Sequence, residues 1–329
     1  MKRILTILLA ASLILATGCK RGKEAQKERS VGGTAEILVV TQTLEQWEGA
    51  QGDAIRDYFT QEQYGLPQPE PLYKVTHVNA SKFSDMFKKH KCILLVETDP
   101  GMVTPKIELG EDIWSAPQRY IKITAPDANS WVETFEKHKE AYKSMFDKTE
   151  LKRIMTILRP STNTDIYKML DKKFGIKMSV PEGFFVAKDE NDFVWLRKEL
   201  DKSGTGLLIY SEDYTDTLQL ELNSIVTKRD ILTNKYIPGP TDGSYMTTEK
   251  EFVPPVTSSS MTFEAGYATE VRGMWCLVGD YMAGPFISYT FVNPNTNKLI
   301  TVEGYVYAPN QDKRNLLMQL QAIICDVKM

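Results

Sequence analysis

An uncharged apolar run near the start of the chain, Ile4 to Ala16, constrains where the rest of the chain can fold. At about 1.5 Å per residue, a helix of this length covers roughly 20 Å, which is less than the roughly 30 Å hydrocarbon core of a bilayer. The run follows Lys2 and Arg3, an arrangement typical of an export signal. No later run approaches eighteen apolar residues, so we expect the remainder to fold in water.

Small residues stand directly before Cys19, in the order Leu-Ala-Thr-Gly-Cys. This resembles the lipobox of bacterial lipoproteins, in which the cysteine thiol receives a diacylglycerol before the signal is removed. Ala16 stands where the commonest form of the motif has leucine. We therefore expect residues 1–18 to be a lipoprotein signal peptide and Cys19 to carry acyl chains such as palmitate. The alternative is an ordinary secreted protein with an incidental Cys19.

Residues 19–34 are rich in charge, poor in large apolar side chains and end in a glycine pair. Such a segment cannot bury enough surface to offset its conformational entropy, so it is expected to be a flexible tether. Lys20 and Arg21 match neither the acidic retention signal nor the acidic surface-export signal of some bacteria. We expect the protein to contact the periplasmic face of the outer membrane through its N-terminal lipid.

The charge balance argues against nucleic acid as a partner. Of 40 basic and 43 acidic side chains, Lys2 and Arg3 leave with the signal, so 38 face 43 and the formal charge is −5. Nucleic-acid binding needs a basic face. The fractions of 42% hydrophobic and 25% charged residues are those of a soluble globular protein.

Three cysteines remain if Cys19 is acylated, namely Cys92, Cys276 and Cys325, each in an apolar stretch. The simplest interpretation is three buried thiols that behave as small hydrophobic residues. A disulfide between Cys276 and Cys325 is the leading alternative. A catalytic thiol is disfavoured because no histidine stands in a nucleophile context.

The periodicity predicts an α+β fold in two related α/β halves, residues 35–160 and 161–329. In the first half, the strands expected are 36–41, 72–78, 92–97 and 119–124, and the helices are 44–59, 81–89 and 127–146. A weak echo aligns Gly65 with Gly175 and Pro71 with Pro181, which indicates an internal duplication. Chance matching is the alternative.

The second half is expected to carry an insertion at about 211–298. It would contain a helix at 216–235 and then a segment interrupted by proline and glycine, where regular structure is not expected. Strands at 269–278, 286–292 and 299–307 form an antiparallel meander, which a C-terminal helix at 313–324 closes.

The strong catalytic and metal-binding signatures are absent from the sequence. Three scattered histidines make a zinc site improbable, so no catalytic residue, metal or cofactor is expected. Carboxylates such as Asp213 and Glu270 could serve a hydrolase, but they are more simply solvated surface residues.

The most unusual stretch runs from Tyr267 to Tyr289. Large and adaptable side chains and two opposite charges gather there, and such residues are enriched at recognition surfaces. The candidate ligand-binding or partner-binding residues are Arg272, Trp275, Asp280, Tyr281, Met282 and Phe286. The alternative is a hairpin in the core of the second half, with Arg272 and Asp280 paired at its edge.

Four motifs together resemble a family of uncharacterised lipoproteins of Gram-negative bacteria, known as a domain of unknown function. These motifs are the lipobox, GYATEVRGMW, GDYMAGPFISY with its M-x-G-P-F segment, and GYVYAPNQDKRNLL. The resemblance implies an envelope lipoprotein of mixed α and β structure, and it carries over no catalytic residues.

The sequence thus favours a lipid-anchored, non-enzymatic envelope protein that binds an envelope protein or a small ligand through its second half. The alternative from another class is a hydrolase of envelope polysaccharide or peptide that uses carboxylates such as Asp213 and Glu270. A third possibility is a structural spacer, which would have no sizeable pocket and no partner.

Overall fold

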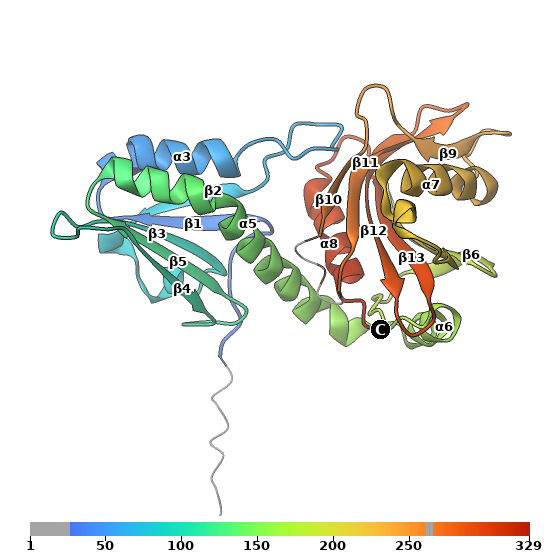
Figure 1. Ribbon diagram of the computed structural model, residues 1–329, viewed down its shortest axis with the longest axis horizontal. Coiled ribbons are helices and arrows are strands. Elements are labelled where there is room, and N and C mark those ends of the chain that lie inside the picture. The colour runs from blue at the N-terminus through green and yellow to red at the C-terminus, as the bar shows by residue number, and fades with distance from the viewer. Residues whose placement is uncertain (1–26, 261–262, 264–265) are drawn as a thin grey trace, which may run out of the picture.

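The computed structural model describes residues 27–260, 263 and 266–329, so Cys19 and the signal segment lie outside the described residues. The described residues form two halves, and each half is built on its own sheet (Figure 1). The expected α+β architecture in two halves is therefore confirmed.

The N-terminal sheet has the order β2-β1-β3-β5-β4, in which β4 is antiparallel to its neighbour and the other pairings are parallel. Helices cover it, so the side chains of its central strands are buried, as in most parallel sheets. The strands are β1 (Glu36–Thr41), β2 (Lys74–Asn79), β3 (Cys92–Thr98), β4 (Lys106–Glu111) and β5 (Arg119–Ala125). The helices are α2 (Leu44–Glu48), α3 (Ala50–Phe59), η2 (Ala80–Lys82), α4 (Asp85–Lys88) and α5 (Ala128–Leu158).

The single helix expected at 44–59 is two helices, because the chain breaks between α2 and α3 at Gly49. The two short helices then approach closely. A Cβ atom on Gly52 would lie 1.8 Å from the carbonyl oxygen of Trp47, so a larger residue could not occupy that position.

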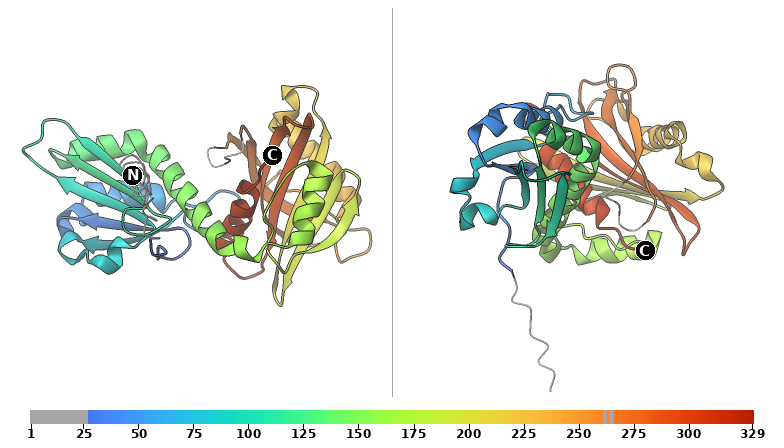
Figure 2. Two further views of the ribbon diagram at one scale, coloured as in Figure 1. Left: turned by 90° about the horizontal axis from the view of Figure 1, so that it is seen from below. Right: turned by 60° about the vertical axis from the view of Figure 1, so that its left-hand side comes forward.

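Helix α5 is the longest element and runs from the N-terminal sheet to the second half (Figures 1 and 2). It begins where the Asp127 side chain accepts a hydrogen bond from the backbone N–H of Ser130, at 2.8 Å. It continues beyond the predicted end at residue 146, because buried residues such as Leu151, Ile154 and Met155 extend its apolar face into the second half.

The C-terminal sheet has the order β10-β11-β12-β13-β8-β7-β6, with β9 paired to β11, and all pairings are antiparallel. Its strands are β6 (Phe185–Glu190), β7 (Phe193–Leu200), β8 (Ser203–Asp213), β9 (Tyr245–Thr248), β10 (Val256–Ser259), β11 (Thr269–Val278), β12 (Ala283–Asn293) and β13 (Lys298–Tyr307). The predicted meander β11-β12-β13 is confirmed.

Helices cover both faces of the C-terminal sheet. Residues of α6 (Thr164–Phe174) and of the expected C-terminal helix α8 (Arg314–Cys325) join the larger core on one face. Residues of α7 (Leu222–Tyr236) join a second core on the other face. The short turns η3 (Arg159–Ser161) and η4 (Thr217–Leu220) precede α6 and α7.

The internal duplication is not seen in the two sheets, since one is largely parallel and the other is antiparallel. The matched glycines also differ in setting: Gly175 ends helix α6, whereas Gly65 lies in a loop that reaches the second half. The proposed insertion at 211–298 contains β11 and β12, which are integral to the C-terminal sheet. The segment expected to be irregular contributes two strands of its own, β9 and β10.

The expected tether is shorter than its composition indicates. Residues 27–34 belong to the folded body: the backbone N–H of Ser30 donates to the carbonyl of Ala116 at 3.2 Å, and that of Val31 donates to Lys89 at 3.0 Å. These contacts use backbone atoms, which is why a charged and glycine-containing sequence did not reveal them.

One hydrophobic cluster extends through both halves. It includes Ile37 and Phe146 from the first half and Ile287 and Ile324 from the second. Among the described residues, no helix is both long and apolar enough to cross a membrane.

Candidate functional site

The two halves meet along a seam formed mainly by α5 and α8. The loop before β2 also crosses this seam, because the Glu70 carboxylate accepts hydrogen bonds from the backbone N–H groups of Lys313 and Arg314 at 2.7 and 3.0 Å. Glu70 therefore caps the N-terminus of α8 from the other half of the molecule. Two cavities lie along this seam.

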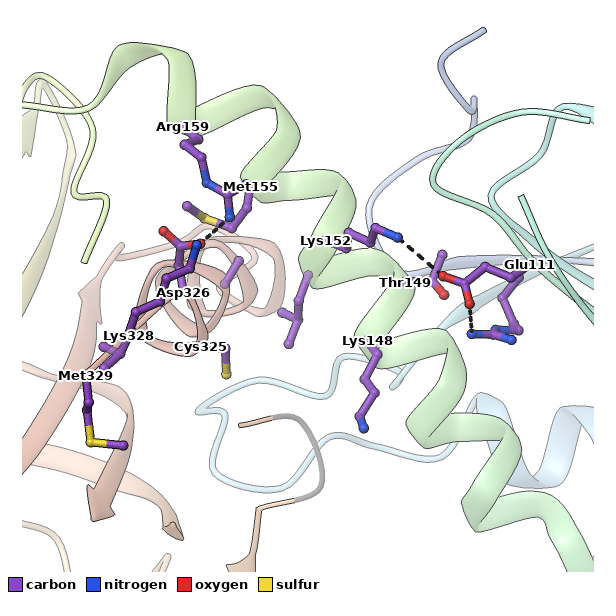
Figure 3. A pocket seen from close by; sticks show the side chains of 14 residues that line it. Glu111, Lys148, Thr149, Lys152, Met155, Arg159, Cys325, Asp326, Lys328 and Met329 are labelled. Carbon is purple, nitrogen blue, oxygen red and sulfur yellow. Dashed lines mark hydrogen bonds and ion pairs between the residues drawn. The ribbon is translucent and has the colours of Figure 1, made fainter. Parts of the chain in front are cut away.

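The larger cavity, here called the basic crevice, has a volume of about 750 Å³ (Figure 3). It lies between α5, the edge of the N-terminal sheet and the residues that follow α8. Its charged lining consists of the cations Arg119, Lys148, Lys152, Arg159 and Lys328 and the anions Glu111 and Asp326. Cations therefore outnumber anions in this crevice, although the chain as a whole is acidic.

Part of this positive charge is neutralised within the crevice. Glu111 accepts from Arg119 at 3.2 Å and from Lys152 at 3.3 Å, and Arg159 pairs with Asp326. Burial would raise the pKa of Glu111, but Lys152 and Arg119 hold it below its ordinary value.

Lys148 and Lys328 make no ion pair with any described residue. Both are exposed, and they come from different halves. In Figure 3, Lys148 points from α5 toward the same side as Cys325 at the end of α8. Buried apolar side chains, among them Leu151 and Met155, complete the lining. The crevice can thus receive an acidic group attached to an apolar body.

The smaller cavity, here called the Arg272 pocket, has a volume of about 340 Å³ and lies nearer the N-terminal ends of both α5 and α8. Its lining includes Tyr64 and Tyr73 from the first half, Glu140 and Asp147 from α5, and Arg272 from β11. It too exists only where the two halves meet.

Arg272 is held by a chain of hydrogen bonds. Its Nε donates to Glu270 at 2.6 Å, Tyr289 donates to the other Glu270 oxygen at 2.6 Å, and Gln321 donates to the Tyr289 hydroxyl at 2.7 Å. Burial would lower the pKa of Arg272, but the Glu270 carboxylate raises it above its ordinary value, so the guanidinium stays charged.

The opposite wall holds a second hydrogen-bonded group. Tyr73 donates to one Asp147 oxygen at 2.6 Å and Lys143 to the other at 2.7 Å. Burial and the Asp147 charge raise the pKa of Tyr73 well above its ordinary value, so this hydroxyl remains a donor.

The six residues predicted as one recognition surface lie in three different places. Trp275 and Phe286 are buried in the core beneath α7, with exposed fractions of 2% and 0%. The Trp275 indole donates to the carbonyl of Val306 at 3.1 Å, and the Arg229 guanidinium lies 4.2 Å from the Phe286 ring centroid. These two residues cannot contact a partner, so a single surface of six residues is wrong.

Asp280, Tyr281 and Met282 form the turn between β11 and β12. Asp280 accepts hydrogen bonds from the Thr241 hydroxyl at 2.5 Å and from the backbone N–H of Tyr281 at 2.6 Å, and both bonds lower its pKa. The Tyr281 side chain is fully exposed. The ion pair between Arg272 and Asp280 is also wrong, because the two residues lie near opposite ends of β11 and have other partners.

The two carboxylates named for a hydrolase are not brought together. Glu270 lies in the Arg272 pocket, whereas Asp213 ends β8 and pairs with Lys298 at 2.7 Å on the surface. Cys276 and Cys325 form no disulfide with each other. Among the residues that the structure describes, no cluster of three or more His, Cys, Asp or Glu side chains could hold a metal ion.

Sequence reasoning missed the basic crevice. Lys148 and Lys152 are four positions apart and lie beyond residue 146, where the helix was expected to end. A signal was present, because the apolar spacing of Phe146, Leu151 and Ile154 continues the helix. For the crevice cations outside α5, no pattern in the neighbouring sequence indicates that they line the same cavity.

Comparisons with known proteins match each half separately. Residues 163–325 match the family model described as Domain of unknown function (DUF4837), and residues 30–159 match Domain of unknown function (DUF8532). A search of curated proteins found no match.

Among solved structures, the Saccharomyces cerevisiae Ran-binding protein Mog1p is similar at 10% identity and a TM-score of 0.30, covering 47% of this chain and 90% of that one. A mutant Mog1 protein is similar at 11% identity and a TM-score of 0.29, covering 46% and 89%. The chain is thus assembled from two domains, each of which matches a protein family of unknown function.

Proposed function

We propose that this protein is a lipid-anchored envelope protein that binds an acidic partner or ligand in the basic crevice between its two halves. The observation that carries the proposal is the convergence of five cations, two of them without ion-pair partners among the described residues, in one cavity of about 750 Å³. Because the chain has more acidic than basic residues, this convergence does not follow from composition.

The anchor part of the proposal rests on the residues before and at Cys19. A short apolar run and small residues before a cysteine support export followed by acylation. Acyl chains contribute about 0.8 kcal/mol per buried CH₂, so two or more hold a protein on a membrane. The folded body includes residues 27–34, so the seven residues 20–26 separate it from the anchor. The proposed location is the periplasmic face of the outer membrane.

Metabolic labelling with a radioactive fatty acid tests the anchor. The wild-type chain is expected to take up label and to sediment with membranes, and Cys19→Ala is expected to do neither. Continued labelling of the Cys19→Ala variant would show that the lipid is attached elsewhere, and an unlabelled wild type would rule the anchor out.

The crevice part rests on charge and on the apolar lining. A carboxylate or phosphate in the crevice would be attracted to Lys148 or to Lys328, and the side chains of Leu151 and Met155 would contact the remainder of the ligand. Such binding depends on electrostatic attraction near the surface, so it should weaken with added salt.

Fluorescence anisotropy with fluorescein-labelled decaglutamate tests the crevice, using the full chain in detergent. We expect the double variant Lys148→Glu with Lys328→Glu to bind at least about tenfold more weakly, which corresponds to about 1.4 kcal/mol. The matched control is Lys168→Glu with Lys202→Glu, which makes the same charge change at exposed lysines outside the crevice. Equal weakening in both variants, or no binding by the wild type, would refute the crevice as the site.

A further inference from the structure

Arg272 and Arg229, two arginines of the second half, differ in how many of their guanidinium nitrogens form hydrogen bonds within the protein. Arg229 has an exposed side-chain fraction of 1%. Its Nε and Nη2 bind the two Glu303 oxygens at 2.8 Å each, and its Nη1 binds the Thr248 hydroxyl at 2.9 Å. All three nitrogens of Arg229 are therefore committed to the fold.

Arg272 commits only its Nε, to Glu270 at 2.6 Å. Among the described residues, no hydrogen bond reaches its two terminal nitrogens, and its side chain is 24% exposed to the Arg272 pocket. The hydrogen bonds from Tyr289 and Gln321 fix Glu270 from behind, so the guanidinium is held in place before any ligand arrives. A planar fork of this kind suits a carboxylate, which accepts two parallel hydrogen bonds.

The pocket also offers a negative charge that no cation neutralises. Glu140 on α5 lines it, is exposed, and makes no ion pair with any described residue, although its carboxylate interacts with the Tyr58 hydroxyl. Asp147 on the same helix already accepts from Tyr73 and Lys143. A ligand that brings a carboxylate to Arg272 therefore meets, in the same pocket, a carboxylate that no described cation pairs with.

The size and walls of the pocket limit the ligand further. A volume of about 340 Å³ holds a molecule of one or two amino-acid residues and excludes an extended polymer. Leu72 and Met318 supply apolar contacts, and the serine hydroxyls of Ser258 and Ser259 supply hydrogen-bond donors and acceptors. This combination is distinct from the basic crevice, which has an excess of positive charge.

From this arrangement we propose that the Arg272 pocket binds a small zwitterion, an amino acid or dipeptide, with its carboxylate on Arg272 and its ammonium on Glu140. This site is additional to the basic crevice and does not depend on binding there. It uses residues from both halves, so the ligand would hold the seam closed.

Equilibrium dialysis followed by mass spectrometry tests the proposal on the full chain in detergent. The probes are a mixture of free amino acids, a mixture of unmodified dipeptides, and the same dipeptides either amidated at the C-terminus or acetylated at the N-terminus. We expect at least one free amino acid or unmodified dipeptide to be retained, and its carboxamide and N-acetyl forms to be retained at least about tenfold less.

Substitutions then assign each end of the ligand. Arg272→Lys keeps the positive charge but loses the planar guanidinium. It should weaken binding of the unmodified ligand about tenfold, and it should not weaken binding of the C-terminal carboxamide form any further. Glu140→Gln should likewise weaken binding of the unmodified ligand about tenfold, and it should not weaken binding of the N-acetylated form any further. The matched control is Arg197→Lys, since Arg197 pairs with Glu199 two positions away on β7, as Arg272 does with Glu270, but lies outside the pocket.

Three results would overturn the proposal: retention of no probe by the wild type, equal retention of amidated and unmodified forms, or equal losses in Arg272→Lys and Arg197→Lys. Each leaves the basic crevice untouched, because decaglutamate binding is measured separately. A circular dichroism spectrum identical to that of the wild type confirms that each variant is folded.

Discussion

His90 is a titratable group that the fold keeps uncharged. It is 7% exposed, its Nδ1 lies 2.9 Å from the carbonyl oxygen of Cys92, and Lys91 and Glu36 are its charged neighbours. Burial, and then the charge of Lys91, lower its pKa to about 4. The folded protein therefore holds a neutral imidazole over a pH range in which the unfolded chain binds a proton.

This difference predicts that the free energy of unfolding falls as the pH falls from about 6.5 to about 4. The loss attributable to His90 between pH 7 and pH 4.5 is roughly 2 to 3 kcal/mol, since about two pH units of the difference are crossed and each corresponds to about 1.4 kcal/mol. Urea denaturation at pH 7 and pH 4.5 measures it, and His90→Met should lose markedly less stability between these two values. If both proteins lose the same amount, protonation of His90 is not the cause.

At the same scale, the residues at which prediction failed are those whose neighbours are distant in sequence. Trp275 and Phe286 were predicted to bind a partner but are buried, and sequence alone does not separate these cases because large side chains occur both in cores and at interfaces. Trp275 lies on the face of β11 that joins the core beneath α7, and nothing local in the sequence of this strand shows that α7 packs there. The predicted partner of Arg272 was also wrong, because Arg272 lies within β11 and Asp280 lies in the turn beyond its end, and each has another partner.

Among the elements, α8 has an N-terminal cap from outside its own segment. Glu70 accepts from the backbone N–H groups of Lys313 and Arg314, and it is 5% exposed. By contrast, Asp127 caps α5 from the position directly before the helix. An aspartate directly before a helix is a cap of the kind that has a sequence signature, whereas a cap from a distant segment has none.

We expect Glu70→Ala to lower the free energy of unfolding by about 1 to 2 kcal/mol, since it leaves two backbone donors at a buried helix end without partners. Hydrogen exchange should accelerate at the amides of residues 313–317. The control is Asp127→Ala, which should cost a similar amount without changing exchange at those amides. Unchanged exchange in Glu70→Ala would show that solvent satisfies the end of α8.

Over the whole molecule, one apolar cluster crosses the seam, so the halves should unfold together. Hydrogen exchange with mass spectrometry during urea unfolding checks this with peptides from residues 36–98 and 193–307. Both sets are expected to share one midpoint. Two midpoints separated by more than about 1 M urea would show that the halves are independent.

The parts of this fold that could be predicted are those whose pattern lies within one short segment of the sequence. The meander β11-β12-β13 and helix α8 follow from alternation and helical periodicity within single segments. The relation between the two halves could not be predicted from the sequence, because a few matching glycines and prolines at a fixed offset do not determine strand order. Both cavities escaped prediction because each is lined by segments from both halves.

The Glu70 cap joins atoms 243 positions apart in the chain, which has a consequence for the order of folding. During synthesis the first half emerges first, while contacts between distant positions form late. Glu70 is therefore exposed to solvent until α8 has been made. Both cavities are lined in part by residues after position 313, so they are completed only when α8 packs against the first half, and a chain that ends before residue 313 would have neither cavity complete.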